Sequence, residues 1–183
     1  MLCSEFAVAP TAIDETLRPG PLVQSVPALA LAKAHAAVAS GVRGIVLGAD
    51  TVVAIDAAVL GKPVDAADAG RMLRLLRGRA HDVITGVALV DTASGREAST
   101  AVVTRVTMGQ YDDAAIEAYV ATGSPLDKAG AYAIQEVGND WVTSVTGPYS
   151  NVVGLPLAVT RRLLEAFGVA LRPRSVSEAC ERE

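Results

Sequence analysis

Apolar positions along the chain fall into two kinds of segment, short runs with strand character and longer stretches rich in good helix formers. An Ala-rich stretch over 28–39 predicts a helix that is capped by Ser25. A short apolar run over 44–49 predicts a buried strand that ends at Asp50. Further strands are predicted in this half at 6–10, 52–55 and 58–60.

The rest of the pattern predicts a helix, a long hairpin, a second helix and a polar loop. Asp65 and Asp68 have the spacing of a capping box, and Asp112 caps another helix. The glycine-punctuated stretch 124–138 is expected to be a functional loop. Other predicted elements are hairpin strands at 82–90 and 101–108, a strand at 141–145 and a helix at 156–167. This order predicts one α/β domain over 1–169, with a mixed twisted sheet and flanking helices, and a flexible tail at 170–183.

Composition and charge narrow the class of protein. With 51% hydrophobic residues in 183 positions, the chain is long enough to bury a core as one domain. A net charge of -4 and no Lys/Arg cluster exclude broad nucleic-acid binding. No run reaches the roughly 18 apolar residues of a membrane span, and the start has no signal-peptide pattern. Cys3 and Cys180 have no metal-ligand spacing, so we expect free thiols in a cytoplasmic protein without a membrane partner.

The basic residues are strongly biased toward arginine. Of the 16 basic residues only Lys33, Lys62 and Lys128 are lysines, which leaves 13 arginines. An ammonium is a compact charge whose pKa can shift, whereas guanidinium is a planar fork that stays protonated. Three lysines in a chain so biased toward arginine are candidates for one common site. The alternative is that they remain by chance on solvated faces.

The sharpest local candidate for chemistry is Gly48-Ala49-Asp50-Thr51. A carboxylate and a hydroxyl emerge there from a buried strand, where open α/β sheets place ligands. The alternative is that Asp50 starts a turn by accepting from nearby backbone amides. The sequence pattern alone leaves both interpretations open.

Two further constellations carry candidate binding groups. Lys62 lies between Gly61 and Pro63, which restrict the backbone in opposite ways and suit either a positioned cation or an exposed turn. The segment 127–135 joins Lys128, Tyr132 and Gln135, whose amide can read a base edge. An ordinary loop with a core tyrosine has the same composition.

Taken together, these motifs resemble those of the Maf family. The matching segments, in the family's order, are Gly48-Ala49-Asp50-Thr51-Val52-Val53, Leu60-Gly61-Lys62-Pro63, 81–86, 127–135 and 152–157. Ile13-Asp14-Glu15 and Lys33-Ala34 also match, so the resemblance runs from Phe6 to Phe167. All three lysines fall inside motif positions.

The resemblance implies an α/β fold like that of Maf and inosine triphosphate pyrophosphatases, with a nucleotide cleft. It implies hydrolysis of a nucleoside triphosphate to the monophosphate and pyrophosphate with Mg²⁺ or Mn²⁺. Asp50 matches the proton acceptor, and a carboxylate with pKa about 3.9 fills that role when a metal acidifies the water. Glu15 and Asp50 would hold the metal. Lys33 and Lys62 would offset charge on the phosphate oxygens.

The resemblance also implies which nucleotides are substrates. Thr51 and Gln135 match positions that set base preference in the branch acting on dTTP and UTP. Lys128 and Glu15 are further substrate-binding candidates, and the family resemblance suggests a homodimer. We therefore expect a pyrophosphatase for dTTP, UTP or modified pyrimidine triphosphates.

The chain departs from the family pattern at its start. The family opens with a strand and a Ser-x-Ser-Pro-Arg-Arg loop that binds phosphates, whereas Phe6 here corresponds to the following strand. Ser-Pro-Arg-Arg occurs nowhere in the sequence, and Ala28 stands where the family usually carries arginine. We therefore expect either that the true start lies further upstream, or that the chain lacks this loop and has weakened turnover.

One other function remains open on the sequence, and a second is disfavoured. A nucleotide-binding regulator without turnover, linked to septum formation as the family's older name suggests, is compatible with the missing arginines. A phosphotransferase with an aspartyl-phosphate at Asp50 would need an Asp-x-Asp-x-Thr motif, which the sequence lacks. His35 and His81 are explained by a helix surface and a strand start, and we assign them no role.

Overall fold

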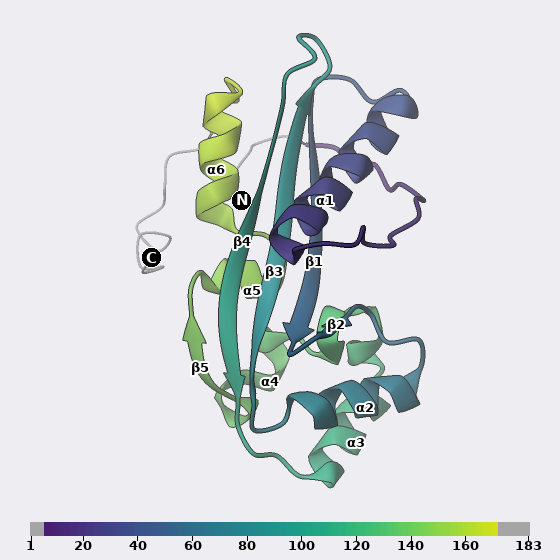
Figure 1. The fold of residues 1–183 in the computed structure, drawn as a ribbon, viewed down its shortest axis with the longest axis vertical. Coiled ribbons are helices and arrows are strands. Elements are labelled where there is room, and N and C mark those ends of the chain that lie inside the picture. Colours follow the sequence, from purple (N-terminus) through teal and green to yellow (C-terminus); the bar gives the residue numbers. More distant parts are fainter. Residues whose placement is uncertain (1–5, 172–183) are drawn as a thin grey trace. The chain divides into compact units, whose positions relative to one another are not determined.

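The computed structural model describes residues 6–171, apart from the side chain of Asn139 (Figure 1). The chain divides into two compact units. Of the described residues, unit 1 contains 6–50, 85–102 and 154–171, and unit 2 contains 51–84 and 103–153. The three long strands of the fold contribute residues to both units: β1 (Ile45–Ile55), β3 (Ala80–Asp91) and β4 (Glu97–Met108).

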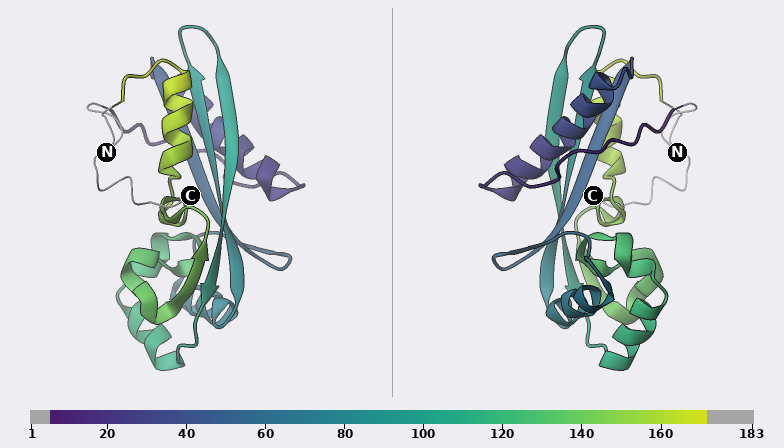
Figure 2. Two further views of the ribbon diagram at one scale, coloured as in Figure 1. Left: turned by 90° about the vertical axis from the view of Figure 1, so that its left-hand side faces the viewer. Right: turned by 90° about the vertical axis from the view of Figure 1, so that its right-hand side faces the viewer.

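Unit 1 is built from the 45–50, 85–91 and 97–102 parts of these strands and from two helices, α1 (Leu22–Ala39) and α6 (Leu157–Ala166). The two helices lie on opposite sides of the strands (Figure 2). A small apolar cluster of Ala34, Ala37, Val46 and Val90 joins α1 to β1 and β3. The last helix ends at Ala166 with Phe167 as its C-cap, one residue before the predicted end.

Two glycines allow α1 to lie directly on the strands. A Cβ at Gly48 would stand 2.1 Å from the carbonyl oxygen of Ala30, and a Cβ at Gly86 would stand 2.5 Å from the nitrogen of Pro27. Both distances are far below any real contact of a Cβ atom, so only glycine fits there. The backbone of α1 therefore contacts the backbone of β1 and β3 with no side chain between them.

Helix α1 begins earlier than predicted. It starts at Leu22 with Pro21 as its N-cap, so Ser25, predicted as the cap, lies inside the helix. Ser25 and Val26 are buried, and Pro27 stands in the second turn. The stabilisation from burying this extra turn outweighs the cost of the backbone hydrogen bond that Pro27 cannot donate. By length and composition α1 is the one helix within 6–171 that could cross a membrane, but its packing on Gly48 and Gly86 is that of a core helix.

All five strands contribute to unit 2, in the order β2-β1-β3-β4-β5. The short strand β2 (Ala58–Leu60) pairs antiparallel with β1, after a turn in which Asp56 takes a φ of 51°. At the other edge β5 (Val142–Thr146) pairs antiparallel with β4. The predicted α/β class, a sheet with flanking helices, is confirmed, and these pairings are antiparallel.

Helices pack on the part of the sheet that belongs to unit 2. The large apolar core there includes Leu73, Leu76, Ile116 and Met108. Helix α2 (Ala66–Leu76) begins where Asp65 accepts the backbone N–H of Asp68 at 2.8 Å, as the capping box predicts. The other helical elements are α3 (Asp113–Ala121), the 3-10 turns η1 (Ser124–Asp127) and η2 (Ala129–Ala131), α4 (Ile134–Trp141) and α5 (Tyr149–Val153).

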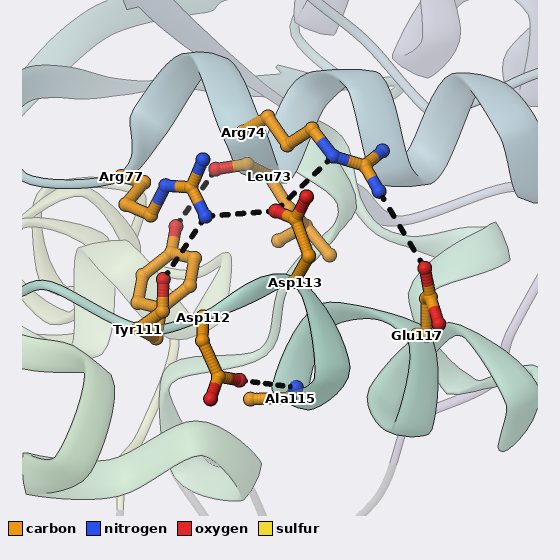
Figure 3. A network of polar contacts seen from close by, with 8 residues as sticks. All are labelled: Leu73, Arg74, Arg77, Tyr111, Asp112, Asp113, Ala115 and Glu117. Carbon is orange, nitrogen blue, oxygen red and sulfur yellow. Dashed lines mark hydrogen bonds and ion pairs between the residues drawn. The ribbon is translucent and has the colours of Figure 1, made fainter.

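An arginine-centred network joins α2 to the start of α3 (Figure 3). Arg77 donates to the Asp113 carboxylate at 2.8 Å and to the carbonyl of Tyr111 at 3.2 Å. The Tyr111 hydroxyl donates back to the carbonyl of Leu73 at 2.8 Å. The contact with Arg77, followed by the charge of Arg74, holds the pKa of Asp113 below its usual value, although burial opposes this. This network holds α3 against α2 and so fixes the start of the segment that leads to Gln135.

Three predictions of local structure are wrong. Residues 6–10 form no strand, and β1 does not end at Asp50 but continues to Ile55. The stretch 124–138, predicted as a loop, is mostly helical. The β-branched residues after Asp50 sustain the strand, and three of them, Val52, Val53 and Ile55, are buried.

Candidate functional site

The centre of the candidate site in unit 1 is a lysine held between two carboxylates. Lys33 Nζ donates to Asp50 Oδ1 at 2.6 Å and lies 2.8 Å from Glu15 Oε1. The side chains of Lys33 and Asp50 are 20% and 10% exposed, whereas that of Glu15 is 55% exposed. The contact thus joins a nearly buried ion pair to a carboxylate that reaches solvent.

Each member of this cluster is placed by a different segment. Lys33 comes from the middle of α1, Asp50 from β1 and Glu15 from the irregular chain that precedes α1. Gly48 and Asp50 are two residues apart on β1, so the side chain of Asp50 leaves the strand on the face where Gly48 meets α1. The close approach at Gly48 is therefore what brings Lys33 within reach of Asp50.

The electrostatics keep Lys33 charged. Burial alone lowers the pKa of Lys33, but its hydrogen bonds to Asp50 and Glu15 outweigh that effect, and the pKa lies above its ordinary value. The group is therefore an ammonium at neutral pH, with two anionic oxygens beside it. Such a group can neutralise charge on a phosphate that approaches it.

Unit 2 brings the other two lysines near each other. The N–H of Gly130 donates to the carbonyl of Gly61 at 3.0 Å, which joins the Lys62 turn to the Lys128 segment. Lys128 contacts Asp127 at 2.6 Å. That contact lowers the pKa of Asp127, and the charge of Lys62 contributes in the same direction. Lys62 is exposed, as a turn lysine would be.

The two predicted specificity residues occupy different elements of unit 2. Thr51 follows Asp50 on β1 and is half-buried, and successive strand residues point to opposite faces. Gln135 is the second residue of α4 and is exposed. The segment before it is conformationally unusual, with φ of 71° at Gly130 and 63° at Ala131. A left-handed alanine costs roughly 1 kcal/mol or more, and such strain is often found at binding sites.

Tyr132 is a core residue, as the simpler interpretation of its segment predicted, and its partner is His81. The side chains of His81 and Tyr132 share a hydrogen bond of 2.8 Å between Nε2 and the hydroxyl. His81 is 2% exposed, and within 6–171 its Nδ1 has no hydrogen-bond partner. Histidine at a strand start gave no sequence signal for this contact, because the partner lies far along the chain.

The buried histidine predicts an acid-dependent loss of stability. Burial lowers the pKa of His81 from 6.5 to about 4, with Asp82 acting weakly in the opposite direction. Between those values the unfolded chain binds more protons than the folded one. The contribution of neutral His81 to stability is therefore complete above pH 6.5 and is lost as the pH falls to about 4. The shift corresponds to about 3 kcal/mol. In urea titrations across this range, we expect His81→Gln to lose less stability than the wild type by about that amount.

The half-exposed His35 provides the matched control for that measurement. Its Nε2 lies 3.0 Å from a carboxylate oxygen of Glu97 on the surface of unit 1, so His35→Gln removes an imidazole and leaves the burial of His81 unchanged. If His81→Gln and the wild type lost the same free energy of unfolding, the buried imidazole would not be the group responsible.

The residues that could hold a metal are few. Within the described part of the chain no group of three or more His, Cys, Asp or Glu residues could hold one. Glu15 and Asp50 place two carboxylate oxygens around one cationic nitrogen, at 2.8 and 2.6 Å. Hard oxygen donors of this kind suit Mg²⁺, which uses one or two carboxylates together with waters and phosphate oxygens.

Comparison with known proteins decides the family. The Maf family profile, described as Maf-like protein, matches residues 1–167. This chain belongs to the Maf family. The resemblance found on the motifs is thereby confirmed over nearly the whole chain.

Among Maf relatives, several are named for one activity. The dTTP/UTP pyrophosphatase of Moorella thermoacetica is 51% identical over 165 residues, which cover 90% of this chain and 85% of the relative. That of Shewanella oneidensis is 49% identical over 166 residues, covering 88% and 84%. That of Anaeromyxobacter dehalogenans is 48% identical over 167 residues, covering 90% and 84%. This Maf chain is therefore similar to nucleotide hydrolases along most of its length.

Proposed function

We propose that this chain is a metal-dependent nucleoside triphosphate pyrophosphatase acting on dTTP and UTP. The observation that carries the proposal is the ammonium of Lys33 held between Asp50 and Glu15. It occurs in a chain about half identical to proteins named dTTP/UTP pyrophosphatase. We include modified pyrimidine triphosphates as substrates, a homodimeric state and a cytoplasmic location without nucleic-acid or membrane partners.

The proposed chemistry begins with the charges of the cluster. A bound Mg²⁺ or Mn²⁺, held by Glu15 and Asp50, would supply positive charge that acidifies water and neutralises phosphate oxygens. Asp50 accepts a proton from the water that attacks the α–β phosphoanhydride, while the electron pair of the breaking bond goes to the departing phosphate oxygen. Lys33 stabilises the negative charge that builds there.

The remaining roles rest on the resemblance of motifs. Lys62 is assigned to the phosphates together with Lys33, and Lys128 to substrate binding. Thr51 and Gln135 are assigned to the base. The amide of Gln135 can accept from the N3–H of uracil or thymine and donate to a neighbouring carbonyl, which matches the edge that these two bases share.

The proposal is tested with a panel of triphosphates in the presence of Mn²⁺ or Mg²⁺. We expect pyrophosphate release from dTTP and UTP at least about tenfold faster than from purine triphosphates, a difference of roughly 1.4 kcal/mol in transition-state binding. Chelation of the metal by EDTA should abolish release, and added Mn²⁺ should restore it. Nucleotide-dependent stabilisation without any release would favour the regulator instead.

A further inference from the structure

A hydrogen-bonded cluster in unit 2 surrounds Gln135 on both sides along the chain. The hydroxyl of Tyr119, on α3, accepts the backbone N–H of Ala133 at 3.1 Å and donates to Glu136 Oε2 at 2.8 Å. Ser124 Oγ, at the start of η1, donates to the same carboxylate oxygen at 2.5 Å. We call Tyr119, Ser124 and Glu136 the α3–α4 clamp. It holds the backbone of Ala133, two residues before Gln135, and the side chain of Glu136, the residue after it.

The ring of Tyr119 contacts the far end of the same segment, beyond a break in the helix at Gly138, where φ is 53° and ψ is -155°. It meets Trp141, the last residue of α4, edge to face at 5.4 Å between centroids. Trp141 in turn stacks on Tyr111 at 4.0 Å, and both of these rings are buried. One tyrosine therefore contacts both ends of α4, by its hydroxyl at the start and by its ring at the end. Its position is set by packing and not by the hydrogen bonds alone.

The protonation states suit the clamp. Hydrogen bonds from Ser124 and then Tyr119 lower the pKa of Glu136, so at neutral pH the group is a carboxylate that only accepts. Burial above all raises the pKa of Tyr119 to about 12, so the phenol keeps the proton that it donates. The contacts persist across the pH range in which an enzyme assay is run.

The clamp fixes the backbone but leaves the amide of Gln135 exposed. An amide presents a donor and an acceptor, and it can pair with uracil in one orientation and with cytosine in the flipped one. The amide can turn over about its own side-chain bond, so the backbone alone does not set which base it pairs with. A held backbone does fix the distance at which the amide meets the base, and a loosened backbone weakens whichever pairing the site favours. Supporting contacts of this kind often decide whether a binding group is held within about 0.5 Å of its working position.

We propose that Tyr119 and Glu136 are positioning residues that set base selectivity through Gln135. The proposal rests on the proposed function, because Gln135 reads a base only if the substrate is a nucleotide. Neither residue needs to touch the substrate. Their effect is expected in the ratio between bases rather than in the chemical step.

The test removes the hydroxyl and keeps the ring. Tyr119→Phe retains the contact with Trp141 and deletes both hydrogen bonds of the phenol. We expect the ratio of kcat/KM for UTP over CTP to fall by about tenfold, equivalent to 1.4 kcal/mol, while kcat for UTP changes by less than about threefold. Tyr149→Phe is the matched control, since this tyrosine of unit 2 is 43% exposed, and it should leave the ratio unchanged.

A double-mutant cycle distinguishes positioning from a general structural effect. If Tyr119 acts through Gln135, then Tyr119→Phe should not lower the ratio any further in a Gln135→Ala background. Glu136→Gln, which keeps an acceptor oxygen, should return most of the selectivity that Glu136→Ala loses. The proposal is overturned if Tyr119→Phe keeps the wild-type ratio, or if its effect is undiminished without Gln135.

Equilibrium binding of UMP and CMP separates this proposal from the proposed function. If the wild type released no pyrophosphate but still bound UMP more tightly than CMP, the hydrolytic function would fail. The clamp would then stand if Tyr119→Phe lowered the ratio of UMP to CMP affinity, and fail if it did not. If the wild type were selective and Tyr119→Phe equally so, the clamp would fail and the hydrolytic function would stand. A wild type with no base preference in either measurement would overturn the clamp.

Discussion

Replacing Gly48 by alanine is expected to lower the free energy of unfolding by about 3 kcal/mol or more, at the upper end of the usual range for overpacking. The added Cβ would stand 2.1 Å from the Ala30 oxygen and 3.0 Å from the Ala34 nitrogen. Both are backbone atoms of α1, so no flexible side chain can move aside. The helix itself must shift, and Lys33 must move away from Asp50 with it. Urea denaturation measures the first effect, and pyrophosphate release measures the second.

Gly61 provides the control for this substitution. A Cβ at Gly61 would meet nothing within 4 Å, and its conformation does not require glycine, so Gly61→Ala is expected to change stability by less than about 1 kcal/mol. If Gly48→Ala were as stable as Gly61→Ala, the close packing of α1 on β1 would be incorrect. The placement of Lys33 derived from it would then fail as well.

Elements with a strong local signal were predictable from the sequence. Asp65 and Asp112 cap helices where their spacing predicted, and each accepts a backbone N–H three residues ahead at 2.8 Å. The long hairpin turns at 92–95 as expected. The errors occur where tertiary packing overrides a local rule. Asp50 looked like the end of a strand, but its carboxylate bonds to Lys33 and the strand continues.

The candidate site shows the same division between local and distant information. Lys33 and Asp50 were predicted for one site by their motifs, and the structure joins them directly. The contacts around the residues that flank Gln135 could not be predicted, because Tyr119, Ser124 and Glu136 come from three elements with no common spacing. Nor did any pattern point to the contact between His81 and Tyr132. Such contacts depend on how helices pack over the sheet, which periodicity does not encode.

Replacing Asp50 by asparagine is expected to lower kcat for dTTP by about a thousandfold, within the range usual for loss of a general base. Asparagine has the same shape and can still accept from Lys33, but it cannot take a proton from water. Because Glu15 still contacts the same ammonium at 2.8 Å and the geometry is kept, we expect the folded state to persist. Circular dichroism and binding of UMP should remain close to those of the wild type.

Asp82→Asn controls for the chemical change itself. Asp82 accepts two hydrogen bonds from Arg105, at 2.8 and 2.9 Å, on strands of unit 2. The same loss of a paired carboxylate there should leave kcat within about threefold of the wild type, since exposed ion pairs contribute about 0–1 kcal/mol. A comparable drop in both variants would mean that activity reports on charge or folding in general.

Glu15→Gln separates proton transfer from charge at the cluster. Glu15 and Asp50 contact the same ammonium, at 2.8 and 2.6 Å, so each substitution removes one negative charge beside Lys33. If the carboxylates serve only to hold a divalent cation, both variants should regain activity as Mn²⁺ is raised. If Asp50 is also the proton acceptor, Glu15→Gln should recover with added Mn²⁺ while Asp50→Asn stays low at saturation. Excess metal replaces lost metal affinity but cannot replace a group that accepts a proton. Recovery of Asp50→Asn would therefore mean that Asp50 only binds metal and that another group is the base.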